Sequence, residues 1–324
     1  MRLLERATII AVIALLVSSH TNCTLAQDAY PTRVVKLIVP AAGGSTTDTI
    51  ARLLADRLAR TWSQSVIVEN VAGGAMNIGA DRVFKAAADG YTMMVSPPSP
   101  ISINQLLYHD IDYDPTKFVA VALLAKIPNA LVVRNDLPAQ SVQELIAYAK
   151  ANPGKLTYAS QGAGSTAHLS ASQLEVLAGI KMVHVPYRGA LPALNDVIAG
   201  HIDMFFDTLT TSVPQWRAGK VRILAVAGAE RSPDVPELPT VAESGVPGFR
   251  SITWFALVAP PGTPGAVVDK VNRDVNAAFA ELTEKFRAVR LEPMPGSAAD
   301  AARFIADETK LWGKVITEAH VTVQ

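Results

Sequence analysis

Cysteine, aromatic residues and net charge are all scarce in this chain. Its 324 residues include one cysteine, aromatic side chains make up 6%, and 29 basic residues balance 29 acidic ones. With no net positive charge and no basic run, the sequence argues against a nucleic-acid surface and against a membrane-binding face. Cys23 lies in a segment that we expect to be removed, so the mature chain has no thiol and no disulfide. A small-molecule partner fits best.

The common signatures of catalysis are also missing. The sequence contains no Gly-x-x-x-x-Gly-Lys-Ser/Thr loop, no Gly-x-Ser-x-Gly elbow and no His-Glu-x-x-His motif. Three histidines, His168, His184 and His201, are separated by whole predicted elements, and none stands at ligand spacing from a cysteine or an acid. We therefore expect no metal site, no resident cofactor and no enzymatic activity.

A long apolar run occurs at the N-terminus. Residues 7–17 are uncharged and apolar, Arg2 and Arg6 precede them, and Thr24-Leu-Ala26 offers small residues of the kind that a signal peptidase reads. The run is too short to span a bilayer, which takes about 20 residues. The pattern predicts a signal peptide over residues 1–26, cleaved near Ala26, and an exported protein; a retained anchor is the alternative.

The chain repeats an order of apolar strand, small-residue loop and helix, which is typical of α/β folds with parallel strands. With 49% hydrophobic residues it can bury a large core in two lobes. Strands are expected over residues 34–39, 65–69, 91–96, 118–125, 130–133, 156–160, 182–186, 203–207, 221–227 and 253–259. Helices are expected after Asp48 and over residues 80–88, 141–152, 168–178, 192–199 and 264–289, and again after Ser297.

Three loops rich in glycine and hydroxyl residues follow predicted strands. They cover residues 43–47, 70–79 and 161–167, and each leads into a helix, where Asp48 or a preceding threonine is the expected N-cap of the first. A helix N-terminus carries free N–H groups and partial positive charge, so such a loop can hold a carboxylate or a phosphate. Each loop alone is also consistent with an ordinary turn; their recurrence favours a binding site.

The third loop, Gly162–Ala167, matches a loose dinucleotide fingerprint between a strand and a helix. An NAD-linked oxidoreductase is therefore the alternative function. The next predicted strand ends in Tyr187-Arg188 and offers no acidic residue to hold a ribose hydroxyl, which disfavours this alternative.

For a few side chains near predicted strand ends, the sequence is consistent with either a ligand-binding role or a structural role. Arg188 and Asp207 each follow a strand's carboxyl end, where they contact a ligand or form a salt bridge across the cleft mouth. His168 begins a helix directly after a loop, so it lines the pocket or supports the cap, whereas His184 alternates within a strand and reads as a core residue.

Several stretches, in order over nearly the whole mature chain, resemble the Bug or TctC family of periplasmic solute-binding receptors. The matching stretches include Leu37-Ile-Val-Pro, Gly43-Gly-Ser-Thr-Thr-Asp48, Val68-Glu-Asn, Asn77-Ile-Gly-Ala80, Ala88-Asp-Gly-Tyr-Thr92, Leu156-Thr-Tyr-Ala-Ser160, Val183-His-Val-Pro-Tyr-Arg-Gly189, Asp203-Met-Phe-Phe-Asp207 and Pro239-Thr-Val-Ala-Glu-Ser-Gly245.

This resemblance implies a two-lobed type II periplasmic-binding-protein fold, each lobe a mainly parallel sheet flanked by helices. Residues 27–126 and 251–324 would form one lobe and residues 127–250 the other. The cleft would close on a mono- or dicarboxylate, aromatic acids included, held by loop backbone, hydroxyls and waters. The implied partners are the two membrane components of a tripartite tricarboxylate transporter, and the receptor would be a periplasmic monomer.

The expected ligand-binding residues follow from the loops and the resemblance together. They are Ala42, Gly43, Gly44, Ser45, Thr46, Thr47, Asp48, Gly74, Ser96, Gly164, Ser165, Thr166, His168, Tyr187, Arg188 and Asp207. Two departures from the family pattern stand in the first loop: Ala41 replaces the usual aromatic residue, and an extra threonine precedes Asp48. The loop at Gly164-Ser165-Thr166 is expected to hold the ligand most firmly, because it combines two glycines, two hydroxyls and a following helix and matches the family pattern without a shift.

Overall fold

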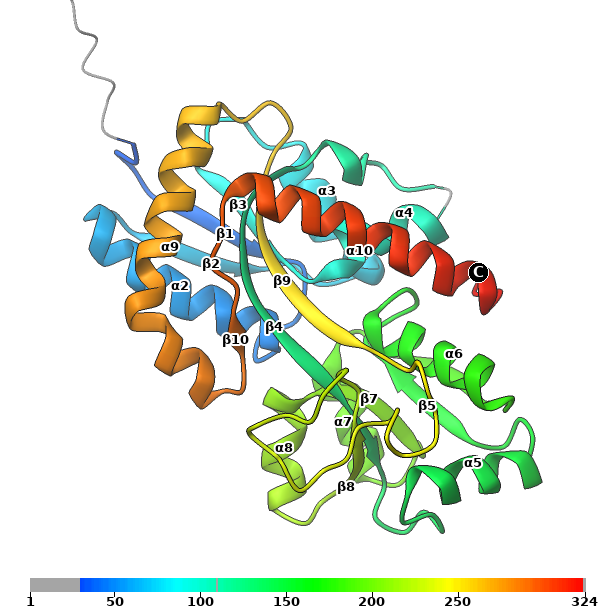
Figure 1. The fold of residues 1–324 in the computed structure, drawn as a ribbon. Coiled ribbons are helices and arrows are strands. Elements are labelled where there is room, and N and C mark those ends of the chain that lie inside the picture. Colours follow the sequence, from blue (N-terminus) through cyan, green and yellow to red (C-terminus); the bar gives the residue numbers. More distant parts are fainter. Residues whose placement is uncertain (1–29, 109, 323–324) are drawn as a thin grey trace, which may run out of the picture.

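Two long strands organise the molecule (Figure 1). The computed structural model describes residues 30–108 and 110–322, so the predicted signal peptide, residues 1–26, lies outside the described residues. Strand β4 (Val119–Val133) pairs antiparallel with β9 (Ile252–Ala259) along its first part, and from Asn129 onward it pairs with β7 (Met204–Thr208). Strand β4 therefore belongs to two sheets and joins the two halves of the molecule.

The first half is a mixed sheet covered by helices. Strands β1 (Val35–Val39), β2 (Val66–Asn70) and β3 (Thr92–Ser96) are parallel, and β9 pairs antiparallel with β3. Val35, Leu37, Ile38 and Val39 are all fully buried, as expected of a parallel strand covered on both faces. The helices of this half, and a two-residue strand that pairs with β4, are α2 (Thr46–Trp62), α3 (Asn77–Phe84), α9 (Gly265–Ala288), α10 (Ala298–Glu318) and β10 (Glu292–Pro293).

The second half repeats this plan. Strands β7, β5 (Thr157–Ser160) and β6 (Val183–Pro186) are parallel, while β8 (Arg222–Val226) pairs antiparallel with the same end of β4 as β7 does. Its helices are α5 (Val142–Ala151), α6 (Thr166–Ala178), α7 (Ala190–Ile198) and α8 (Leu209–Arg217). Short turns of helix complete the chain: η1 (Gly74–Met76), η2 (Ser99–Ile103), α4 (Asn104–Leu107) and η3 (Pro115–Lys117).

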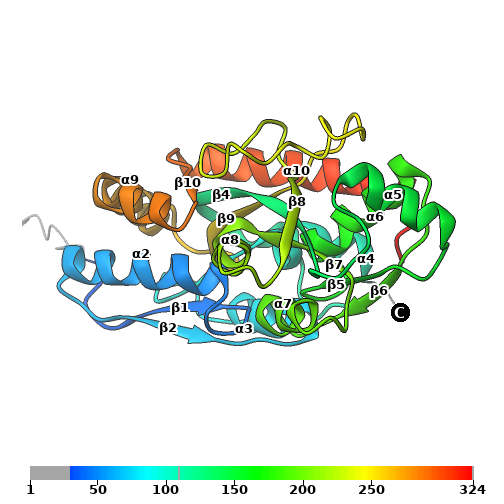
Figure 2. The ribbon, with the colours of Figure 1, turned by 90° about the horizontal axis from the view of Figure 1, so that it is seen from below.

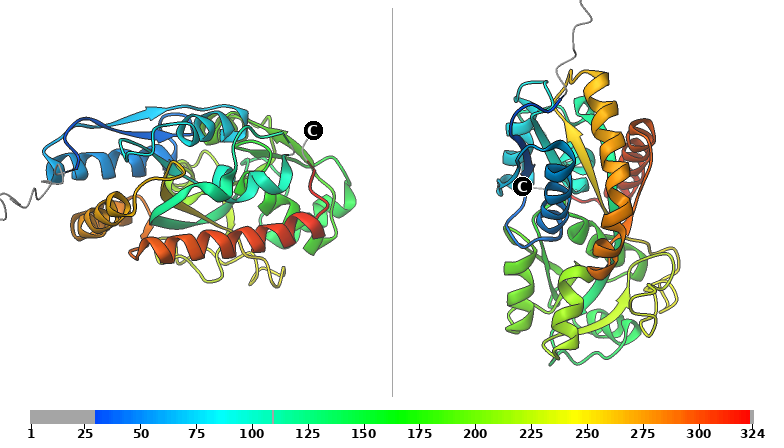
Figure 3. Two further views of the ribbon diagram at one scale, coloured as in Figure 1. Left: turned by 90° about the horizontal axis from the view of Figure 1, so that it is seen from above. Right: turned by 90° about the vertical axis from the view of Figure 1, so that its left-hand side faces the viewer.

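Packing of the helices connects the halves further. Helices α2 and α9 lie side by side over one face of the first sheet, as Figure 2 shows. Helix α10 runs along the molecule toward the second half, where it reaches α6 (Figure 3). Trp312 and Ile316 of α10 share a buried apolar cluster with Leu169 of α6. No helix among the described residues has the length and apolarity that crossing a membrane requires.

Strand β4 differs from the two strands expected on either side of Pro128. Proline cannot donate a ladder hydrogen bond, which normally ends a strand. On the edge of β4 away from β9, strand β10 pairs with β4 up to Lys126, and strand β7 pairs with β4 from Asn129 onward. Pro128 therefore lies in the gap between these two neighbouring strands. The missing donor costs nothing there, and the strand continues. The lobe boundaries at residues 126/127 and 250/251 stay a prediction.

Helix α8 was not expected from the sequence. Its residues, Leu-Thr-Thr-Ser-Val-Pro-Gln-Trp-Arg, include β-branched threonines and a valine, which have low helix propensity, and Pro214 lies inside the helix. One face of this helix is buried, at Leu209, Ser212 and Val213. Packing of this face against the rest of the second half therefore stabilises a helix that the intrinsic propensities of its residues do not favour.

Candidate functional site

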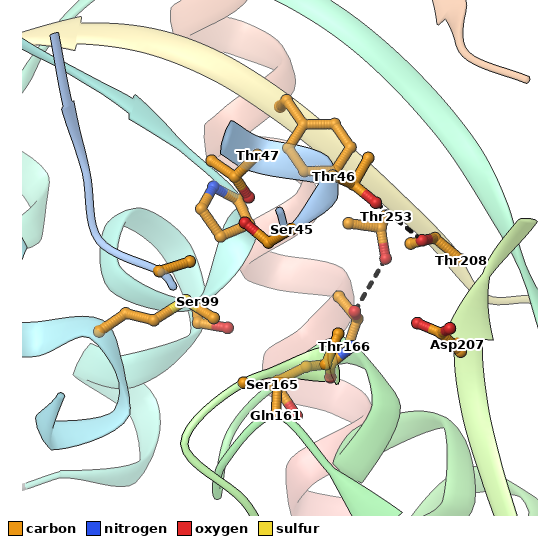
Figure 4. Close-up of a pocket in the computed structure, with 16 residues that line it drawn as sticks. Ser45, Thr46, Thr47, Ser99, Gln161, Ser165, Thr166, Asp207, Thr208 and Thr253 are labelled. Atoms are coloured by element: carbon orange, nitrogen blue, oxygen red, sulfur yellow. Dashed lines mark hydrogen bonds between the residues drawn. The ribbon is translucent and has the colours of Figure 1, made fainter. Parts of the chain in front are cut away.

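A pocket lies between the two halves, where the N-termini of α2 and α6 approach the crossing strands (Figure 4). Loops that follow the carboxyl ends of β1, β5 and β7 contribute to it, which is where ligands sit in open α/β sheets. Most of its polar side chains are hydroxyls, and among the described residues no lysine, arginine or histidine lines it. The lining residues are Ala41, Ser45, Thr46, Thr47, Met76, Pro97, Ser99, Gln161, Ser165, Thr166, Gly189, Ala190, Asp207, Thr208, Thr253 and Phe255.

The first half presents the N-terminus of α2 to this pocket. Ser45 is the N-cap, with φ −71° and ψ 163°, and its hydroxyl accepts from the backbone N–H of Asp48 at 3.3 Å. We expected the cap at Asp48 or at a threonine before it, and this prediction was wrong. The cap is Ser45, which adopts the extended conformation that an N-cap requires. Thr46 and Thr47 form the first turn, whose N–H groups have no acceptor within the helix.

Asp48 holds the first loop in place rather than lining the pocket. Its carboxylate accepts from the backbone N–H of Gly44 at 2.9 Å, from Arg52 Nε at 3.0 Å and from Asn70 Nδ2 at 3.0 Å. Burial alone would raise the pKa of Asp48, but the hydrogen bonds from Arg52, Gly44 and Asn70 outweigh it and lower the pKa below its usual value. An ionised Asp48 thus fixes the loop that leads to Ser45.

The second half presents the N-terminus of α6 in the same way. Ser165 is the N-cap, with φ −70° and ψ 159°, and it accepts from the backbone N–H of His168 at 3.4 Å. Its side chain also lines the pocket, with the residue only 4% exposed. Two helix N-termini of matching geometry therefore face one pocket from opposite halves, and each adds its hydroxyls and free N–H groups to it.

Two stacked histidines support the loop behind Ser165. His168 Nδ1 accepts from the backbone N–H of Gly164 at 3.1 Å, and its ring stacks on His184 with the centroids 4.0 Å apart. His184 Nε2 lies 2.6 Å from Ser160 Oγ. Burial lowers the pKa of His168 to about 3, with a further contribution from His184, and lowers the pKa of His184 to about 4. Both rings are neutral near pH 7 and serve as supports.

Asp207 is the one acidic side chain among the lining residues. The residue is fully buried, and its Oδ2 accepts from Thr211 Oγ1 at 2.6 Å, while Oδ1 has no hydrogen-bond partner among the described residues. Burial raises the pKa of Asp207 to about 7, against the opposing effect of hydrogen bonds from Thr211 and the backbone of Thr208. Near neutral pH this carboxyl group is therefore divided between its acid and its ionised form.

The halves touch each other around the pocket. Thr46 Oγ1 and Thr208 Oγ1 lie 2.9 Å apart, Ser99 Oγ donates to the carbonyl of Gly164 at 3.3 Å, and Tyr108 Oη donates to the carbonyl of Ala163 at 3.0 Å. These bonds join the first half to loops of the second across the pocket. The described arrangement is thus a closed one.

Six of the sixteen residues expected to bind the ligand line the pocket. These are Ser45, Thr46, Thr47, Ser165, Thr166 and Asp207. The structure does not place the other ten in its lining: Ala42, Gly43, Gly44, Asp48, Gly74, Ser96, Gly164, His168, Tyr187 and Arg188.

Tyr187 and Arg188 point to other partners or to solvent. Tyr187 Oη donates to Asp196 at 2.5 Å, and Arg188 is exposed. Within the described residues no ion pair joins Arg188 to Asp207, so the salt bridge considered for them is not formed.

Sequence reasoning missed several lining residues. Thr208 directly follows Asp207 at a strand's carboxyl end, and Gln161 opens the third loop, so the same rule that selected their neighbours could have found both. Thr253 reaches the pocket only because β9 crosses between the halves, where its hydroxyl lies 2.8 Å from Thr166 Oγ1. Nothing in the local sequence signals that contact.

Comparison with known proteins agrees with this geometry. The family model described as tripartite tricarboxylate transporter family receptor, TctC, matches residues 50–321. Protein BugT of Bordetella pertussis is 34% identical over 315 residues, which cover 96% of this chain and 97% of the relative.

Solved structures of similar proteins share the fold. Rpa4515 of R. palustris, solved with adipate, is 40% identical with a TM-score of 0.88 and covers 90% of this chain and 99% of its own. MatC of Rhodopseudomonas palustris, solved with bound malate, is 32% identical with a TM-score of 0.83 over 89% of this chain and all of its own. The expected α/β periplasmic-binding fold is confirmed, and its sheets combine parallel strands with the antiparallel strands β4, β8 and β9. This chain belongs to the TctC family of periplasmic solute-binding receptors, which are binding proteins and not enzymes.

Proposed function

We propose that this receptor captures a small organic acid in the periplasm and delivers it to the two membrane components of a tripartite tricarboxylate transporter. The observation that carries the proposal is the convergence of two helix N-termini, capped by Ser45 and Ser165, on one pocket whose lining, over the part of the chain that the structure describes, includes no basic side chain. The ligand is a mono- or dicarboxylate, aromatic acids included.

The chemistry of the lining suits a carboxylate. Free N–H groups and the partial positive charge of a helix N-terminus stabilise an anion, and hydrogen bonds to a carboxylate are roughly twice as strong as bonds between neutral groups. With a terminus in each half, one ligand can contact both α2 and α6, so binding favours the closed arrangement over an open one. The ligands of the two similar solved proteins, adipate and malate, are both small dicarboxylates.

The alternative of an NAD-linked oxidoreductase is not retained. The loop over residues 162–167 that suggested it contributes Ser165 and Thr166 to a pocket shared with the other half, and the chain belongs to a receptor family. Membership of a periplasmic family also supports export with cleavage near Ala26, and we propose that the mature receptor is a monomer.

Native mass spectrometry of the receptor purified from its own periplasm tests the proposal. We expect a bound species that dissociates on mild activation and has the exact mass of an organic acid. The control is the same protein after it has been unfolded, dialysed and refolded. This sample should lack the bound organic acid and should bind it again when the acid is added back. A bound cation, neutral sugar or nucleotide would contradict the proposal.

A further inference from the structure

Asp207 is a buried carboxyl group that forms no ion pair within residues 30–108 and 110–322, and it lines a pocket that, on the proposed function, receives a carboxylate. It stands at the carboxyl end of β7, is fully buried, and leaves Oδ1 without a hydrogen-bond partner among the described residues. The neighbouring Thr208 completes the inter-half contact with Thr46. A carboxylate that occupies the pocket therefore enters a space walled in part by another carboxyl group.

The two protonation states of Asp207 have opposite effects on such a ligand. In the ionised form, Asp207 and the ligand carboxylate are two like charges close together in a largely buried site, and they repel each other. In the acid form, Oδ1 carries a proton that it can donate to a ligand oxygen, and the resulting O–H···O⁻ bond is short and strong. Two carboxyl groups in one site generally share a proton for this reason.

Other charged groups do not offset the burial of Asp207. The titratable or charged side chains on the elements packed against β7 are Lys126 of β4, Tyr158 of β5, His168 and Glu175 of α6, Asp196 of α7 and Arg217 of α8. Among the described residues, none of these forms a hydrogen bond or an ion pair with Asp207. The shift of its pKa to about 7 arises from burial, which no neighbouring charge opposes.

We propose that the receptor binds its carboxylate ligand together with one proton, which Asp207 holds between its own oxygen and an oxygen of the ligand. The proton comes from solvent, and no covalent bond forms or breaks. This inference rests on the proposed function. Proton sharing makes the affinity for the ligand depend on pH near neutrality. It also makes Asp207 select anionic ligands, because only the protonated form donates to a carboxylate, whereas the ionised form would accept from a ligand ammonium group.

Titration calorimetry of the wild-type receptor with adipate and with malate tests the inference. Binding is measured at pH 6 and pH 8 in pairs of buffers that differ in their enthalpy of ionisation, and the slope of heat against that enthalpy gives the number of protons taken up. We expect close to one proton at pH 8 and few at pH 6, and a Kd that rises up to about tenfold per pH unit above pH 8. Both acids are fully ionised at pH 8, so proton uptake measured at that pH belongs to the protein and not to the ligand.

Two variants separate Asp207 from the rest of the pocket. Asp207→Asn keeps the shape and a hydrogen-bond donor but cannot titrate, so its proton uptake should vanish and its Kd should be the same at pH 6 and pH 8. Ser165→Ala should bind more weakly yet take up the same proton. Binding by the wild type without proton uptake at pH 8 would overturn the inference and leave the proposed function intact. Absence of binding from pH 5 to pH 9 by adipate, by malate and by the acid recovered in native mass spectrometry would overturn both.

Discussion

At the scale of single residues, Ser165 combines two roles, as the cap of a helix and as part of the pocket lining. Its hydroxyl accepts from the N–H of His168 and so caps α6, and the same side chain lines the pocket. A serine hydroxyl has two acceptor lone pairs and one donor, so the cap leaves the donor available. The donor is the group that a ligand carboxylate can use.

Replacing Ser165 by alanine should therefore lower both stability and affinity. Loss of the cap is expected to cost about 1 kcal/mol of unfolding free energy. Loss of the hydroxyl is expected to weaken binding by roughly 0.5–1.5 kcal/mol for a neutral partner, and by up to about 3 kcal/mol for a carboxylate. Denaturant unfolding and calorimetry on the same preparation measure the two effects.

Ser141 supplies the matched control. It caps α5, away from the pocket, and accepts from the N–H of Glu144 at 3.2 Å. Ser141→Ala should lose similar stability and keep the wild-type Kd. An unchanged Kd in Ser165→Ala would remove Ser165 from the binding site.

The sequence predicts some of these residues and not others for a physical reason. Ser45 and Ser165 could be named as candidate binding residues because each stands in a glycine-rich loop just before an apolar helical pattern, although the cap of α2 was expected at Asp48 or a threonine. The complete burial of Asp207 depends on β4 and β5, which pair with β7 from distant parts of the chain, as well as on α8, which follows β7 directly. Its unusual pKa is a property of that packing and is invisible in the residues beside it.

At the scale of elements, the loops before α2, α3 and α6 are held by different means. Asp48 ties the first loop, and His168 with His184 supports the third. The second loop relies on close packing at Gly79, in α3. A Cβ atom built there would lie 2.8 Å from the carbonyl oxygen of Val71 and 2.9 Å from Pro40 Cα, which are backbone atoms that cannot move aside easily.

Gly79→Ala is thus expected to destabilise the receptor by about 1–3 kcal/mol, the usual cost of overpacking. Gly265→Ala is the matched control, because Gly265 is also helical, at the start of α9, and nothing lies within 4 Å of its Cβ position. The control should be neutral or slightly stabilising. Equal unfolding free energies for Gly79→Ala and the wild type would show that α3 does not need this close approach.

The alternation of strands and helices was predictable because apolar periodicity and turn residues mark it locally. The continuous strand β4 was not, because Pro128 is tolerated only through the offset of its neighbours in two different sheets. Helix α8 was missed for a related reason: its propensity is poor, and burial of Leu209 and Val213 decides its conformation.

At the scale of the whole molecule, the pocket exists because the halves meet. Thr46 contacts Thr208 across it, and Thr166 contacts Thr253, which in turn donates to Asn129 Oδ1 at 2.9 Å. Asn129 and Thr253 lie on β4 and β9, so hydrogen bonds link the N-terminus of α6 to the strands that cross between the halves. Length and composition predict two lobes, but the contact between them depends on residues far apart in the sequence.

Calorimetry of the mature receptor with matched acids and amides tests the central claim, carboxylate recognition, most directly. Adipate, malate and benzoate would each be compared with the corresponding uncharged amide, which has the same shape. At least one acid should bind, and its amide should bind at least about tenfold more weakly, because the N-termini of α2 and α6 stabilise negative charge. Binding of the amides as tightly as the acids, or of none of the acids, would contradict the account.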